Sequence, residues 1–230
     1  MTAPSAAESP DRYHPESNIH QYLAAKAAST DTAALLAPAT HDRWSVKTAA
    51  DADAQALTTQ APTTATIAEL IAQPLPAFLP PDGRSDGPEK TVYQLTATLQ
   101  AFGREADGDY HMVMADDQGN TMIAEIPNPG DFTSPSYFAT QITNTRTAFD
   151  SHFTITEDIS APTAPAAAAA LAAAGATGFQ DVNVPVTLTG LGYFDFKHGQ
   201  RGVAPNAIEL HPVINIVFTG APAAGGGAPA

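Results

Sequence analysis

The stretch that decides the fold runs from Asp107 to Pro127 and reads DGDYHMVMADDQGNTMIAEIP. Its centre, Asp117-Gln-Gly119, suits a three-residue hairpin loop in which a type I turn ends on a glycine in the left-handed conformation. Asp116 then pairs with Asn120, and the two arms of the stretch form an antiparallel hairpin.

This loop sets the register of the whole hairpin. One face pairs only apolar residues: Tyr110 with Ile126, Met112 with Ala124, and Met114 with Met122. The other face pairs His111 with Glu125, Val113 with Ile123, and Ala115 with Thr121. A slip of one residue would mix the two faces, so the pattern argues against it. The sequence predicts that His111 lies opposite Glu125, on the face away from the core.

Three more segments follow the period of two that is typical of strands. They cover 92–102, 182–192 and 208–218, and with 109–116 and 120–127 they make five strands. Thr133-Ser-Pro135 predicts the start of a helix that reaches about Ser151. Three strands, a helix and two strands make a mainly β fold in the element order of an OB-like five-stranded barrel. A small sandwich with the same strands paired differently is the alternative.

The rest of the chain divides around this barrel, which we place at 90–219. Residues 1–18 are polar and are predicted to be disordered. Residues 19–89 are predicted to form a helical or irregular segment with a Pro-rich linker that packs on the barrel. Inside it, Thr66-Ile-Ala-Glu69 has the pattern of a capping box that opens a short helix. An Ala-rich insertion at 161–177 interrupts the barrel, and a Gly-rich tail at 220–230 is predicted to be flexible.

The chain is acidic, with 24 acidic residues against 10 basic ones and a formal charge of −14. The barrel segment from 91 to 218 alone has four basic and thirteen acidic residues, hence a formal charge of −9. Such a surface repels phosphate backbones, so nucleic acid is an unlikely partner. A small molecule, a carbohydrate, a peptide or a protein is preferred. No apolar run approaches the roughly 20 residues that cross a bilayer, so no membrane span is expected.

The chain has no cysteine, which excludes disulfides and thiolate chemistry but suits any compartment. Its first residues lack the basic and apolar segments of a secretory signal. A soluble cytoplasmic protein is therefore the default expectation, and export stays open if a precursor was trimmed.

Polar residues gather on the outer face of the predicted barrel. On the last strand Ile208 and Leu210 point inward, while Glu209 and His211 point outward. With the hairpin pair they give a candidate metal or ligand site made of His111, Glu125, Glu209 and His211, on the face where OB-folds commonly bind ligands. Imidazole and carboxylate groups bind divalent metals and act as acids and bases. The alternative is a cross-strand pair under a covering segment, which we favour because metal sites need three or more convergent ligands.

A second candidate is the loop between the fourth and fifth strands. Its polar and aromatic residues would lie at one rim of the barrel: Tyr193, Asp195, Lys197, His198 and Arg201. Loops on a rigid barrel often carry function, which makes this a candidate binding loop. An ordinary solvated turn is the simpler explanation.

No Gly-x-Ser-x-Gly elbow, His-Glu-x-x-His helix or dinucleotide fingerprint is present. We therefore predict no catalytic residues and no cofactor, and leave only a divalent metal open. The leading hypothesis is a non-catalytic binding or interaction module with an unidentified ligand. The alternatives are a metal-dependent hydrolase, such as a phosphodiesterase using the outer His/Glu cluster, and a structural component that packs through its Ala-rich and Gly-rich segments.

Several motifs resemble those of a family of uncharacterised bacterial proteins. They are Trp44-Ser-Val-Lys-Thr48, Thr91-Val-Tyr93, Asp109-Tyr-His111, Thr121-Met-Ile-Ala-Glu-Ile-Pro127 and Gly202-Val-Ala-Pro-Asn-Ala-Ile-Glu-Leu-His-Pro212. The resemblance covers roughly Arg43 to Phe218, apart from the Ala-rich insertion. No activity is established for that family, so the resemblance implies a common fold and no catalytic role. Staphylococcal-type nucleases share the barrel class, but the chain has no counterpart of their arginine-rich active site.

Overall fold

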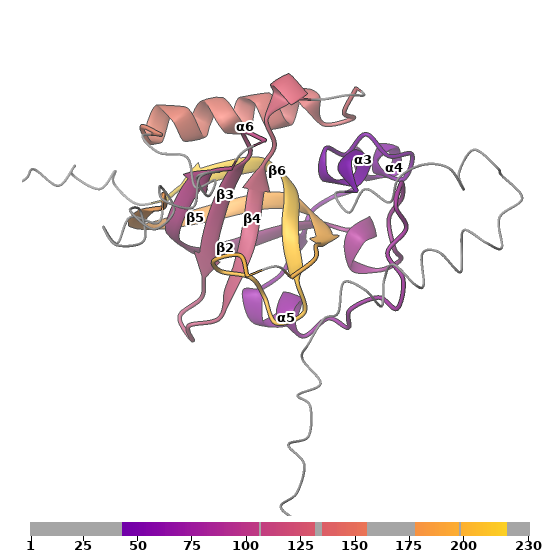
Figure 1. The fold of residues 1–230 in the computed structure, drawn as a ribbon, viewed down its shortest axis with the longest axis horizontal. Coiled ribbons are helices and arrows are strands. Elements are labelled where there is room, and N and C mark those ends of the chain that lie inside the picture. The colour runs from indigo at the N-terminus through magenta and orange to yellow at the C-terminus, as the bar shows by residue number, and fades with distance from the viewer. Residues whose placement is uncertain (1–42, 106, 132–134, 156–177, 198, 220–230) are drawn as a thin grey trace, which may run out of the picture.

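The computed structural model describes residues 43–105, 107–131, 135–155, 178–197 and 199–219 (Figure 1). The predicted disordered N-terminus, the Ala-rich insertion, the Gly-rich tail and His198 lie outside these residues. In the part of the chain that is described, no helix has the length and apolar character needed to cross a membrane.

The fold is mixed α/β and consists mostly of strands, and the five long strands expected from the sequence are all present. The strands are β1 (Thr63–Thr64), β2 (Val92–Arg104), β3 (Tyr110–Ala115), β4 (Thr121–Ile126), β5 (Gln180–Phe194) and β6 (Ile208–Phe218). The helices are α3 (Trp44–Lys47), α4 (Ala54–Leu57), α5 (Ile67–Ile71) and α6 (Ala139–His152), with 3-10 turns η1 (Pro88–Lys90) and η2 (Pro129–Asp131).

All six strands belong to one sheet, in the order β1-β2-β3-β4-β6-β5. An additional pairing between β2 and β5 closes five of them into a ring, while β1 runs parallel to β2 outside it. Within the ring only β4 and β6 are parallel, where Ile123 faces Glu209 and Ala124 faces Leu210. The predicted helix between β4 and β5 is α6, which lies along the upper edge of the ring in Figure 1. It begins at Ala139, so the prediction that Pro135 is its first residue is wrong, and Thr133 and Ser134 lie outside the described residues.

The hairpin register predicted from the sequence is confirmed. β3 and β4 pair Tyr110 with Ile126, His111 with Glu125, and Met114 with Met122. The loop also has the predicted form, since Gly119 lies at φ 83° and its amide donates to the carbonyl of Asp116 at 3.1 Å. The Asp116 carboxylate accepts the amides of Gln118 and Asn120, each at 2.9 Å, which holds the turn closed.

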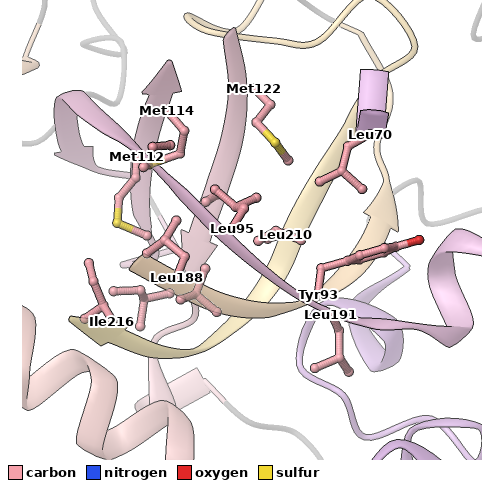
Figure 2. Close-up of a cluster of buried hydrophobic side chains, with 14 of the residues drawn as sticks. Leu70, Tyr93, Leu95, Met112, Met114, Met122, Leu188, Leu191, Leu210 and Ile216 are labelled. Carbon is pink, nitrogen blue, oxygen red and sulfur yellow. The ribbon is translucent and has the colours of Figure 1, made fainter. Parts of the chain in front are cut away.

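Buried apolar side chains from every strand of the ring gather in one cluster (Figure 2). The labelled side chains of this core come from all five strands and from α5, and include Leu95, Met112, Met122, Leu188 and Leu210. Each fully buried side chain of this size contributes roughly 1.5–3 kcal/mol. At one end α6 adds Phe149, whose ring meets Phe102 edge-on at 5.0 Å.

The segment before the ring is held by a capped helix and by buried arginines. Thr66 caps α5, and its amide donates to the Glu69 carboxylate at 2.8 Å, which completes the predicted capping box. Arg43 makes a bidentate ion pair with Glu89, at 2.6 and 2.8 Å. Arg84, from the Pro-rich linker, donates to Asp51 at 3.1 Å and to the carbonyl of Gly192 at 3.2 Å. These contacts tie the segment to the end of β5, close to the outer face of the ring.

Candidate metal centre

The four candidate residues of the outer face are all buried. His111 is on β3, Glu125 on β4, and Glu209 and His211 on β6, and the exposed fraction of each is between 0 and 4%. The face is covered because the loop after β5 folds back over it. Gly202 lies so close to Val113 that a Cβ atom on it would come within 2.7 Å of Val113 Cγ1. His111 and Glu125 therefore form a cross-strand pair under a covering segment, which is the alternative favoured from the sequence.

His111 is oriented by this covering loop. Its Nε2 lies 2.9 Å from the carbonyl oxygen of Arg201, an acceptor that requires the proton to be on Nε2. Its Nδ1 faces two carboxylates, 3.1 Å from Glu105 Oε1 and 3.2 Å from Glu125 Oε1. A backbone carbonyl that fixes one ring nitrogen while the other meets carboxylates is the usual arrangement around a metal-binding histidine. Phe179 packs edge-on against the ring, at 5.3 Å between centroids.

The other oxygen of Glu125 faces the second histidine. Glu125 Oε2 lies 3.1 Å from His211 Nδ1, and His211 Nε2 lies 3.6 Å from Asp109 Oδ2. Despite the short contacts none of these four atoms has a partner in hydrogen-bonding geometry among the described residues. The other Asp109 oxygen accepts the amide of Asn128 at 2.6 Å, which fixes the direction of the carboxylate. Glu125 thus stands between two imidazoles, one on each oxygen.

Glu209 lies next to this cluster but outside its tightest groups. It faces Tyr193 across the β5–β6 ladder, and neither of its oxygens has a hydrogen-bond partner among the described residues. Two sets of residues each offer donor atoms that lie within 4.8 Å of one another. The first set is Glu105, His111 and Glu125, and the second set is Asp109, Glu125 and His211. Three of the four predicted residues are thus brought together, and Glu209 borders them.

Electrostatics of the cluster follow from burial and from close opposite charges. Burial would lower the pKa of His111, but hydrogen bonding to Glu105 and Glu125 outweighs it and raises that pKa to about 10. Burial would also lower the pKa of His211, but the charge of Glu125 and the contact with Asp109 raise it to about 9. Without a metal ion, both imidazoles therefore carry a positive charge at neutral pH.

The carboxylates respond in opposite directions. Burial would raise the pKa of Glu125, yet the charge of His211 and the hydrogen bond from His111 hold it well below its usual range. Burial, reinforced by the charges of Asp195 and Glu125, raises the pKa of Glu209 well above its usual range. Burial would lower the pKa of Lys47, at the end of α3, but the carboxylates of Glu125 and Asp195 raise it well above its usual range. An ionised Glu125 therefore lies near three positively charged groups, those of His111, His211 and Lys47.

Three members of the cluster were missed by the sequence reading. Asp109 precedes His111 by two residues and so shares its face, a signal that alternation along a strand offers. Glu105 is placed in the cluster because its amide donates to the carbonyl of Asp109 at 2.9 Å, just beyond the β2–β3 ladder. Lys47 belongs to a distant segment, and no local pattern points to it.

The candidate binding loop is tied mostly to itself and to the ring. Tyr193 is not part of the loop but a buried residue near the end of β5, which runs two residues further than predicted. Asp195 lies 3.4 Å from both Tyr193 Oη and Gln200 Nε2. Lys197 Nζ donates to the carbonyl of Pro205, and Arg201 pairs with Asp181 at 2.6 Å. A binding role for these residues stays a prediction.

Comparison of the chain with protein-family models, with curated proteins and with solved structures found no match. The fold and the site together define a protein with a closed ring of five strands and a buried His/Glu/Asp cluster on the outer face of that ring.

Proposed function

We propose that this protein is a binding module on an OB-like barrel, and that its outer-face cluster holds a divalent metal ion. The OB-like class is supported by the ring order β2-β3-β4-β6-β5 and by the position of α6, which lies between β4 and β5 along the chain. The metal is supported by one observation above all: a buried carboxylate, Glu125, with an imidazole nitrogen about 3 Å from each of its oxygens.

Glu105, His111 and Glu125 are the ligands that we assign to this ion. Ligand atoms at 2.0–2.2 Å from one ion are separated by roughly 3.0–3.5 Å in octahedral or tetrahedral geometry. His111 Nδ1 lies 3.1 and 3.2 Å from the two carboxylates, which is the nitrogen–oxygen spacing of such a set, and all three atoms lie within 4.8 Å of one another. The Arg201 carbonyl leaves Nδ1 as the ligating nitrogen. One nitrogen with two carboxylates, and no sulfur, suits Mn²⁺, Fe²⁺ or Zn²⁺.

Burial of the charges supports the same conclusion. Leaving an ionised group in a protein interior without partners costs several kcal/mol. An ion of charge +2 bound at this set would replace the proton on His111 Nδ1 and offset the charges of Glu105 and Glu125. Because that proton leaves when the metal binds, the affinity should fall as the pH is lowered.

Metal content and titration of the full chain test this proposal. Protein purified without a metal-affinity step, stripped and titrated with Mn²⁺ or Zn²⁺, should bind at least one equivalent. His111→Ala should weaken binding at least tenfold, because it removes a ligand rather than an outer-sphere contact, for which losses of 10–100-fold are typical. His152→Ala is the matched control, since His152 stacks on Phe218 at 3.8 Å, on α6.

A wild-type chain that takes up neither metal would overturn the proposal. So would equal losses of affinity in His111→Ala and His152→Ala, provided that both variants keep the wild-type circular dichroism spectrum. A buried network of imidazolium and carboxylate groups would then be the whole role of the cluster.

The second candidate function is a metal-dependent hydrolase. It is favoured by the Glu105 side chain, which is 27% exposed while that of His111 is 1% exposed, so that the first ligand set reaches solvent on that side. Three protein ligands and an open position are the arrangement of catalytic metal sites. Metal-loaded protein should then hydrolyse bis(p-nitrophenyl) phosphate, with loss of turnover in Glu105→Gln. Absence of turnover with both Mn²⁺ and Zn²⁺ would remove this candidate.

The negative charge of the chain supports a partner other than nucleic acid for the proposed binding module. A chain with a formal charge of −14 gives no basic footprint for a phosphate backbone. We therefore expect no salt-sensitive binding of single-stranded DNA in a fluorescence anisotropy titration, and prefer a small molecule, a glycan or a protein. Binding that weakens steeply between about 50 and 200 mM salt would contradict this preference.

A further inference from the structure

We propose that Glu125 bridges two metal ions, the second of them held by Asp109, Glu125 and His211. This inference rests on the proposed function, because it adds a second ion to the same cluster. The two donor sets each lie within 4.8 Å, and they share only Glu125. A carboxylate can place one oxygen on each of two ions, and paired ions in such sites lie about 3.5–4 Å apart.

The two Glu125 oxygens face different histidines, which supports a carboxylate that bridges two ions. Oε1 faces His111 Nδ1 at 3.2 Å, and Oε2 faces His211 Nδ1 at 3.1 Å. A carboxylate that served one ion alone would need only one of these imidazoles. Here each oxygen has its own histidine, from a different strand, and each histidine has a further carboxylate beside it.

Unpartnered atoms mark the second position. Asp109 Oδ2, Glu125 Oε2 and both ring nitrogens of His211 are buried without a hydrogen-bond partner among the described residues. The exposed fractions of these three residues are 1, 4 and 0%. Buried polar groups are nearly always satisfied, so four such atoms in one place call for a missing partner. His211 contacts both carboxylates, Glu125 Oε2 at 3.1 Å and Asp109 Oδ2 at 3.6 Å, but neither contact has hydrogen-bonding geometry; a metal ion bound to the lone pairs would satisfy all these residues at once.

Burial also separates the two positions by their access to solvent. Glu105 opens the first set to water, whereas all three ligands of the second set are sealed. We therefore expect the first ion to exchange readily with a chelator and the second to be retained for much longer. A sealed ion of this kind serves structure, and an exchangeable neighbour serves binding or chemistry.

Stoichiometry and magnetic coupling of Mn²⁺ in the full wild-type chain give the test. We expect two Mn²⁺ per chain by elemental analysis, and an exchange-coupled spectrum by electron paramagnetic resonance, because a shared carboxylate couples the two spins. Brief treatment with EDTA should remove one equivalent and leave the six-line spectrum of an isolated ion.

Two variants divide the pair. His211→Ala should bind one Mn²⁺ and give the uncoupled six-line spectrum, and Glu105→Gln should keep the sealed ion while the exchangeable one binds at least tenfold more weakly. Two uncoupled ions in the wild type would overturn the bridge, as would two ions retained by His211→Ala. One Mn²⁺ in the wild type, lost in His111→Ala, would overturn the second site and leave the proposed function standing. No metal at all would overturn both, and the wild-type measurements decide even if a variant fails to fold.

Discussion

Glu89 is the residue on which the N-terminal segment depends. Its two oxygens accept five hydrogen bonds: two from Arg43, two from Ser85, and one from the amide of Phe194 at the end of β5. These donors come from three parts of the chain, so a single carboxylate joins α3, the Pro-rich linker and the ring. Both members of the Arg43–Glu89 pair are buried, with side chains 2 and 0% exposed. Removing one charge leaves the other buried and uncompensated.

Glu89→Gln should therefore lower the free energy of unfolding by about 3–5 kcal/mol, the usual cost of breaking a buried ion pair. Urea unfolding followed by circular dichroism measures it. Glu69→Gln is the control, because Glu69 sits in an exposed capping box, where the loss should be about 1 kcal/mol or less. Equal losses in the two variants would show that the buried pair has no special weight.

Glu89 also predicts how stability depends on acid. Burial would raise the pKa of Glu89, but the hydrogen bonds and charge of Arg43 lower it below its ordinary value of 4.5. Such a carboxyl stabilises the folded state fully above the unfolded pKa, and this contribution is lost as the pH falls through the folded pKa. The gap in unfolding free energy between wild type and Glu89→Gln should therefore narrow from about pH 6 to about pH 3. A gap that stays constant over this range would contradict the assignment.

At the scale of elements, the loop between β5 and β6 decides that the outer face is closed. It provides the Arg201 carbonyl that orients His111, and it lies on β3 through Gly202. Gly202 has φ 86° and Gly199 has φ 91°, a conformation that favours glycine at both positions. The two differ in surroundings, because a Cβ on Gly199 would meet nothing within 4 Å.

Gly199→Ala and Gly202→Ala form a matched pair for this loop. Both should lose about 1–2 kcal/mol of unfolding free energy from the left-handed backbone. Gly202→Ala should lose roughly 1–3 kcal/mol more, because the new methyl group collides with Val113. Gly202→Ala should also weaken Mn²⁺ binding, since it displaces the acceptor of His111 Nε2, while Gly199→Ala should not. Equal metal affinities in the two variants would argue against a positioning role for the loop.

At the scale of the whole molecule, the proposed metal site joins segments that are far apart in sequence. Glu125 lies on β4, His211 lies on β6, and Asp109 directly precedes β3. Lys47, at the end of α3, interacts with Glu125 through its charge. A ligand that binds only the folded chain stabilises it by RT ln(1 + [L]/Kd), about 2.7 kcal/mol at a hundredfold excess over Kd. The cluster should therefore couple metal binding to global stability.

Metal-loaded wild-type protein should melt roughly 5–10 °C above the chelator-treated protein, since 1 kcal/mol corresponds to about 2–4 °C at this chain length. Differential scanning calorimetry with and without EDTA measures the shift. His152→Ala should keep the whole shift, and His111→Ala should lose the part that the exchangeable ion contributes. A shift that is the same in both variants would place the bound metal elsewhere.

Local patterns were sufficient for the hairpin and for all five long strands. Alternation from Tyr110 to Ile126 admits one register, because a slip would bury His111 and Glu125 in the apolar core. The capping box at Thr66 and the helix around Phe149 follow in the same way from contacts between near neighbours. Such features depend on interactions within a few residues, or across one tight turn, and these can be read from the order of the residues.

Only the tertiary structure decided what becomes of the polar face. The sequence placed His111 and Glu125 together, but the contact of Glu125 with His211 needs the parallel pairing of β4 with β6, between segments more than 80 residues apart. The polar face is covered only because Gly202 folds back onto Val113, and Lys47 adds a positive charge near Glu125 from a distant segment. Long-range pairing and burial depend on how the whole ring closes, and no local pattern encodes them. The tertiary structure therefore turns the predicted His111–Glu125 pair into a buried cluster that also contains Asp109 and His211.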